Sequence, residues 1–198
     1  MTHVAYDPYA DESLGTGDNP NQQQQKERLS PTSLVFIAAA VLMLSVVAWG
    51  IYDNAQSQPE NGPAPAFALP MLEEEGVFSL ASQQGDVVVI NFWGSWCGPC
   101  RREAPMLQEA YEHFAPQGVV FVGIAVKDIE SDALDYIDEF NITYPNVMDW
   151  GGELEEAYRT QGVPETFIVD RNGDVHKFFF AQPTEREFYS AIEEALES

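Results

Sequence analysis

The two cysteines of this 198-residue chain lie close together, in the stretch FWGSWCGPCRRE. Cys97 and Cys100 are separated by one glycine and one proline. A pair at this spacing can exchange electrons with another disulfide, supply half of a metal site or form a small structural staple. Redox exchange needs one cysteine that ionises near neutral pH and a second thiol close enough to resolve a mixed disulfide.

The rest of the sequence offers little support for a metal site or a staple. A structural zinc ion is nearly always bound by four ligands, and the predicted domain adds only His113 and His176 to the cysteines. A disulfide between residues this close in sequence closes too small a loop to stabilise a fold strongly. The residues therefore favour redox chemistry, and we expect neither a metal nor a cofactor.

The elements around the cysteines are predicted to place Cys97 at a turn from a strand into a helix. The run VVVINFW, residues 87–93, is typical of a strand that is covered on both faces. Residues 97–114 show helical spacing of apolar side chains, and Pro105 should kink that helix. The helix dipole and the unpaired N–H groups at its start would lower the pKa of the Cys97 thiol, with Cys100 one turn further on the same side.

The remaining segments predict an α/β sandwich with a mixed central sheet. An N-terminal hairpin is expected around residues 73–76. The other expected elements are a strand at 118–126, helices at 131–140, 153–160 and 185–196, and a hairpin with strands at 166–170 and 175–180.

Upstream of this domain, residues 34–51 form an uncharged apolar run about long enough to span a bilayer as a helix. Two basic residues precede the run and acidic residues follow it, which predicts a single-pass anchor in the cell membrane with the N-terminus in the cytoplasm and the catalytic domain outside. The expected organisation is a disordered cytoplasmic tail at 1–33, the transmembrane anchor at 34–52, a linker at 53–65 and the folded domain at 66–198.

Two alternatives apply to the apolar run. It could belong to a cleaved signal peptide, with a weak small-residue cleavage site near Ala55, although cleavable apolar cores usually run about 7 to 15 residues. It could also be a buried helix of a soluble protein, which its polar, low-complexity flanks disfavour.

The charge of the chain is strongly acidic, with 32 acidic against 9 basic residues and a formal net charge of -23. A surface of this kind repels phosphate groups, so we exclude nucleic acid as a partner. An acidic coat is found in proteins of halophiles, and the presence of only three lysines agrees with that origin. A basic protein partner is the alternative explanation.

A proline directly before a predicted internal strand is a further local signal. In GVPETF, residues 162–167, Pro164 stands where a trans peptide bond would fit the strand ladder poorly. A cis Val163–Pro164 bond would resolve the conflict, and an ordinary trans proline at the start of a strand is the alternative.

These motifs together resemble the thioredoxin superfamily: WCGPC after an apolar strand, Pro105 five residues beyond the second cysteine, and GVPETF before a hairpin. The anchor, the pieces APAF and LASQQG ahead of the cysteine strand, and the hairpin TFIVDRNGDV resemble more specifically the TlpA/ResA/CcmG branch. Members of that branch are membrane-tethered thiol-disulfide oxidoreductases outside the cytoplasm. The resemblance covers about residues 63–198 and implies a thioredoxin-like fold.

Carried over residue by residue, the resemblance makes Cys97 the exposed nucleophile and Cys100 the resolving thiol of a redox disulfide. It also implies that the Val163–Pro164 bond is cis and lies beside this disulfide, where Val163 offers backbone groups to a substrate strand. The substrate-binding residues expected on this basis flank the cysteines and the cis bond: Trp96, Gly98, Pro99, Val163 and Pro164.

Three polar positions bear on the proton chemistry. Glu103 matches the acidic residue that follows the motif in ResA-like proteins and is thought to tune proton transfer at the buried thiol; a first-turn glutamate favoured by the helix dipole is the alternative. Asn91 stands where thioredoxins proper carry a buried aspartate, so water or Glu103 would have to replace that group. Glu165 is expected either to contact substrate or to be an exposed loop residue.

The resemblance implies a function as well as a fold. We expect the protein to reduce disulfides in exported proteins, with apocytochrome c as a target, and to take electrons from a membrane thiol transporter. A redox-linked docking or holdase factor without essential turnover and a thiol peroxidase are the alternatives.

Overall fold

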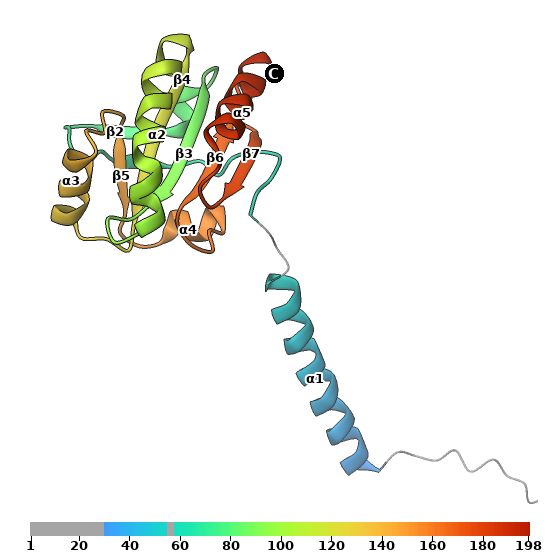
Figure 1. The fold of residues 1–198 in the computed structure, drawn as a ribbon. Helices are drawn as coiled ribbons and strands as arrows, with labels where there is room; N and C mark the ends of the chain where they lie inside the picture. The colour runs from blue at the N-terminus through green and yellow to red at the C-terminus, as the bar shows by residue number, and fades with distance from the viewer. Residues whose placement is uncertain (1–29, 55–57) are drawn as a thin grey trace, which may run out of the picture. The chain divides into compact units, whose positions relative to one another are not determined.

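The computed structural model describes residues 30–54 and 58–198, and the chain divides into two compact units after Tyr52. Most of the first unit's described part is helix α1, Pro31–Asn54 (Figure 1). Among the described residues, it is the one helix long and apolar enough to cross a membrane. Its 24 residues rise about 36 Å, against an apolar bilayer core of about 30 Å. Residues 1–29 of the predicted tail lie outside the described part.

The second unit is built on a mixed sheet of five strands in the order β5-β4-β3-β6-β7. β3 runs parallel to β4, and β4 to β5, whereas β6 is antiparallel to both of its neighbours. The predicted α/β architecture with a mixed central sheet is therefore confirmed. The strands are β3 (Val87–Trp93), β4 (Val119–Val126), β5 (Asn146–Asp149), β6 (Glu165–Val169) and β7 (Val175–Phe180).

Strand β3 is buried along its whole length because the sheet has a core on each face. Val87, Val89 and Trp93 point into one core, and the alternate residues point into the other. The first core is shared with helices α2 (Gly98–Phe114), α3 (Glu130–Glu139) and α5 (Glu185–Glu197). The second includes residues of the short helix α4 (Glu153–Tyr158).

An N-terminal hairpin is present as predicted, formed by β1 (Ala68–Pro70) and β2 (Val77–Ser79). The residues that follow β1 lie beside the edge strand β5. Met71 forms a β-bridge with Val147, and the Leu72 N–H donates to the Asn146 carbonyl at 2.8 Å. The short 3-10 helices η1 (Leu80–Gln83) and η2 (Ala115–Gln117) precede β3 and β4 respectively.

Strand β5 was not expected from the sequence. Its four residues, NVMD, carry polar side chains at both ends, so they show neither the alternation nor the long apolar run that indicates a strand. The strand forms because its backbone pairs with the C-terminal half of β4, where Gly123 is opposite Asn146. This pairing places the end of β5 at the same edge of the sheet as the ends of β3 and β4.

The domain also begins earlier than Ala66, where we expected it to start. Gln58 is buried, and the Ala64 N–H donates to the Gly173 carbonyl at 2.9 Å. Pro63 bridges to Asp174 at the start of β7. Residues 58–65, assigned to a linker from their composition, therefore pack on the domain, while residues 55–57 lie outside the described part of the chain.

Candidate active site

Cys97 and Cys100 form a disulfide at the point where the chain turns from β3 into α2. Their Cα atoms are 5.2 Å apart. Cys97 is the N-cap of α2, and its Sγ accepts a hydrogen bond from the Cys100 N–H at 3.1 Å. A sulfur that caps a helix in this way is stabilised in its thiolate form, so this geometry favours ionisation of Cys97 once the disulfide is reduced.

The expectation that Cys97 is exposed is wrong for this disulfide form of the protein. Cys97 is 3% exposed and Cys100 is fully buried, and both side chains belong to the core that α2 shares with the sheet. The covering group on the other side is the Val163 carbonyl, whose oxygen lies 3.5 Å from the Cys97 sulfur. The exposed residues next to the disulfide are Trp96, Gly98 and Pro99.

The Val163–Pro164 peptide bond is cis, which is the geometry that the family resemblance implies. Val163 is half-buried and Pro164 is buried, so this predicted substrate loop offers backbone more than side chain. The structure thus brings Val163 against Cys97, while Trp96, Gly98 and Pro99 surround the disulfide at the surface.

Glu103 lies one turn beyond Cys100 on α2 and is buried. Its Oε1 accepts a hydrogen bond from the Asn91 Nδ2 at 2.9 Å, and Asn91 also donates to the Thr166 hydroxyl at 3.0 Å. Within the described part of the chain, the other oxygen of Glu103 has no hydrogen-bond partner. Burial raises the pKa of Glu103 to about 7, and the Asn91 hydrogen bond only partly opposes that rise.

Aromatic packing holds this region in place. Trp93, the last residue of β3, stacks on Tyr136 with ring centroids 4.3 Å apart, and the Tyr136 hydroxyl donates to the Cys100 carbonyl at 3.0 Å. The Trp93 indole N–H donates to the Asn146 side chain at 3.2 Å, directly over Gly123. A Cβ at Gly123 would lie 2.0 Å from the Asn146 oxygen, so this hydrogen bond requires glycine.

Glu165, considered as an exposed loop residue or a substrate contact, is buried. Its Oε1 accepts hydrogen bonds from the backbone N–H groups of Gln161 at 2.8 Å and Gly162 at 3.2 Å, and from the Gln58 side chain at 3.5 Å. Burial raises the pKa of Glu165, and these hydrogen bonds act in the opposite direction. Glu165 therefore fixes the loop that leads to the cis bond.

Sequence reasoning missed Asp128, which follows β4. Its carboxylate accepts hydrogen bonds from the Ser95 N–H and, at 2.7 Å, from the Ser95 hydroxyl, so it holds the loop that leads to Cys97. One signal could have found it, because residues that follow neighbouring parallel strands meet at one edge of a sheet. Tyr136 carried no such signal, since it reads as an ordinary core residue of a helix.

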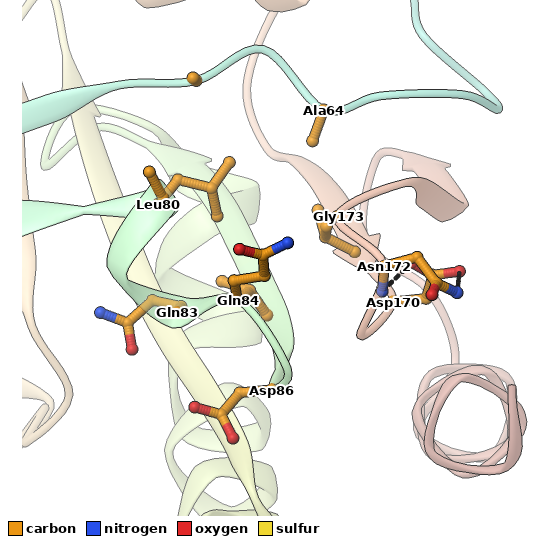
Figure 2. Close-up of a pocket in the computed structure, with 12 residues that line it drawn as sticks. Ala64, Leu80, Gln83, Gln84, Asp86, Asp170, Asn172 and Gly173 are labelled. Carbon is orange, nitrogen blue, oxygen red and sulfur yellow. Dashed lines mark hydrogen bonds between the residues drawn. The ribbon is translucent and has the colours of Figure 1, made fainter.

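No cluster that could hold a metal ion occurs among residues 30–54 and 58–198. One pocket of about 220 Å³ lies far from the disulfide, where β3 begins and β6 ends, and Figure 2 shows Asp86, Asp170 and Asn172 among the residues around it. The residues that line this pocket include no cysteine, serine, threonine, lysine or histidine. The chemistry of the domain is therefore assigned to the disulfide edge.

The fold and the disulfide site define a thiol-disulfide oxidoreductase of the thioredoxin fold, and the comparisons with known proteins agree. The sequence model of the AhpC/TSA family matches residues 61–178. The chain belongs to this family.

Named relatives are similar over most of the chain. A "Thiol-disulfide oxidoreductase ResA" of Geobacillus kaustophilus is 30% identical over 81% of this chain and 92% of its own length. The protein of the same name from Bacillus subtilis is 29% identical over 76% of this chain and 87% of its own length. A crystal structure of a thiol:disulfide interchange protein from Chlorobium tepidum, 30% identical, superposes with a TM-score of 0.63 and covers 72% of this chain and 99% of that one.

Proposed function

We propose that this oxidoreductase reduces disulfide bonds in exported proteins and works outside the cytoplasm, tethered by helix α1. The observation that carries the proposal is the Cys97–Cys100 disulfide at the start of α2, where a backbone N–H is already directed at the Cys97 sulfur. Relatives named thiol-disulfide oxidoreductases support the same chemistry. The apolar helix and the basic residues ahead of it support the tether and its orientation.

The reaction starts from the reduced dithiol. The Cys97 thiolate attacks one sulfur of the substrate disulfide, a mixed disulfide forms, and the first substrate sulfur leaves as a thiolate that takes up a proton. The Cys100 thiol then loses its proton and attacks the Cys97 sulfur, which releases the second substrate sulfur. Two electrons and two protons pass to the substrate, and the Cys97–Cys100 disulfide is left behind.

Glu103 is the proton acceptor in the second step. It lies one turn from Cys100 in the same buried region, and a pKa of about 7 allows its carboxyl group to take up and release a proton near neutral pH. Asn91, which replaces the aspartate of thioredoxins proper, acts by holding one oxygen of Glu103. The other oxygen, without a partner among the described residues, is the one free to exchange the proton.

A reductant must regenerate the dithiol after each cycle. We assign this role to a membrane thiol transporter, and we place apocytochrome c among the exported targets, as the family resemblance implies. Both assignments rest on that resemblance, and identification of trapped partners tests them.

The central test uses the full chain in detergent micelles, with dithiothreitol as the reductant and insulin as the disulfide substrate. Wild-type protein should accelerate insulin reduction, and Cys97→Ser should reduce the rate to that of dithiothreitol alone. Equal rates for the two proteins would overturn the proposal. If the double variant Cys97→Ser/Cys100→Ser still binds exported proteins, the protein is a docking factor. Consumption of peroxide by the wild-type protein would indicate a thiol peroxidase.

Trapping identifies the partner. In Cys100→Ala the mixed disulfide with Cys97 cannot be resolved, so the bound protein should co-purify and be released by dithiothreitol. Proteolysis of membrane vesicles of known orientation tests the topology, since the domain should be digested only when its proposed outer side is accessible.

A further inference from the structure

Large apolar side chains are exposed at one edge of the domain. Trp96 is 58% exposed, Ile129 is 65% exposed and Trp150 is 70% exposed. Each lies on the loop that follows one of the three parallel strands β3, β4 and β5. Because parallel strands end at the same edge of a sheet, these residues share the edge that carries the disulfide. We refer to Trp96, Ile129 and Trp150 as the three-loop surface.

Hydrogen bonds join this surface to the active site. The Trp96 indole N–H donates to the Lys127 carbonyl at 3.1 Å. The backbone N–H and the hydroxyl of Ser95 both donate to the Asp128 carboxylate. Trp96 is directly adjacent to Cys97. A polypeptide that contacts the three-loop surface therefore passes beside the reacting sulfur.

A pocket of about 210 Å³ opens within this surface, between the loops that follow β4 and β5. Its lining residues include three acidic residues, Asp128, Asp149 and Glu155, together with Trp150 and one lysine, Lys127. Lys127 is bound to Glu155 at 2.9 Å. In the described part of the chain, the hydrogen bonds to Asp128 and Asp149 come from uncharged donors, so the pocket keeps an excess of negative charge.

From these contacts we infer that the pocket and the three-loop surface bind a lysine or arginine side chain of the polypeptide substrate, close to the substrate's disulfide. The inference rests on the proposed function and adds a substrate class to it. The pocket has room for one side chain, and the Trp150 ring beside it suits a cation, which is attracted to the face of an indole.

The charge around the pocket argues for the same occupant. Residues 127–156 contain ten acidic side chains and one lysine. An acidic polypeptide, a nucleic acid or a second copy of this acidic chain would be repelled there, whereas a cationic segment is attracted. The exposed apolar groups would then contact the rest of the substrate segment.

The test compares two peptides that each contain one internal disulfide and differ only in two flanking residues, which are lysines in one and glutamines in the other. Full-length wild-type protein in zwitterionic detergent should reduce the lysine peptide with a kcat/KM about tenfold higher. The preference should shrink in high salt, which screens charges. Trp150→Ala should remove most of it and Trp150→Phe should retain part of it, because phenylalanine keeps an aromatic face.

Val77→Ala is the matched control, because Val77 is 61% exposed and lies on the N-terminal hairpin. It should preserve the full preference for lysine. Equal rates for the two peptides with wild-type protein, or a preference that Trp150→Ala leaves intact, would overturn the inference while the reductase activity still stands.

A second measurement tests peptide binding to the three-loop surface separately from disulfide reduction. Peptides with serine in place of both cysteines cannot react, and their binding can be followed by calorimetry. The lysine version should bind more tightly than the glutamine version to wild-type protein, and Trp150→Ala should abolish the difference. If neither disulfide peptide is reduced but this binding difference is found, the proposed function fails and the docking surface stands. Equal binding of the two serine peptides counts against the surface.

Discussion

Glu103 and Glu165 are both buried, and both lie near the disulfide, but their partners differ. Glu103 follows Cys100 by one helical turn, and its carboxylate receives one hydrogen bond from the Asn91 amide. Glu165 follows the cis bond, and one of its oxygens receives hydrogen bonds from two backbone N–H groups and from Gln58.

This difference in partners supports the proposed proton transfer by Glu103 and a structural role for Glu165. A buried carboxylate with several N–H donors keeps its charge more easily than one with a single amide donor. Glu103 therefore changes its protonation near neutral pH, which suits it to exchange a proton with Cys100. Glu165 uses its hydrogen bonds to fix the loop that faces Cys97. Burial alone would not distinguish these two roles.

The largest effect is expected from removal of the Glu165 carboxylate. Glu165→Ala leaves three donors without their acceptor and removes buried methylene groups, so the free energy of unfolding should fall by about 4 kcal/mol. Glu165→Gln keeps a carbonyl acceptor and should cost about 1 kcal/mol. Urea unfolding of the full chain in detergent, followed by tryptophan fluorescence, measures both values. Similar losses in the two variants would show that the hydrogen bonds to Glu165 are unimportant.

The next effect is a pH dependence of stability that comes from Glu103. Its pKa rises from 4.5 to about 7 on folding, so between these pH values the folded protein binds more protons than the unfolded chain. Stability from this group is complete below pH 4.5 and is lost as the pH rises through 7, by about 3 kcal/mol. The difference in unfolding free energy between wild type and Glu103→Gln should show this loss, which isolates Glu103 from the other carboxyl groups. A difference that is constant from pH 4.5 to 8 would contradict the proposed protonation.

A smaller effect is expected on the reaction itself. When an external dithiol attacks Cys97, the Cys100 sulfur leaves as a thiolate, and protonated Glu103 can supply its proton. Stopped-flow reduction of the disulfide in Glu103→Gln should therefore be about tenfold slower than wild type at pH 6 and similar at pH 8.5, where Glu103 is already ionised. Glu165→Gln is the matched control, and its pH profile should follow that of the wild type.

The parts of this site that depend on local patterns were predictable from the sequence. Strand β3 was predicted with the bounds that the structure shows, because an unbroken apolar run needs no information about its neighbours. The turn at Cys97 likewise follows from adjacent residues. The cis bond at Val163 was expected from the family resemblance, because the adjacent residues alone left a trans proline open.

The missed parts depend on pairings between distant residues. Ser95 and Asp128 are 33 positions apart, and Asn91 and Thr166 are 75 apart. A single sequence does not record which polar side chains meet after folding, so the burial of Glu165 and the role of Asp128 were not foreseen. β5 was missed for the same reason, since its pairing with β4 rather than its composition makes it a strand.

Gln58 provides the finest test of the difference between the two glutamates, because in the described part of the chain its side chain hydrogen-bonds to Glu165 and not to Glu103. Its amide lies 3.5 Å from the Glu165 Oε1, which is long for a hydrogen bond, and two backbone N–H groups remain if it is removed. Gln58→Ala should therefore lower the free energy of unfolding by less than about 1 kcal/mol. It should leave the pH profile of disulfide reduction unchanged, since the Asn91–Glu103 contact is untouched. A larger loss of stability would mean that residues 58–65, at the N-terminal end of the domain, contribute to holding the Val163–Pro164 loop against the disulfide.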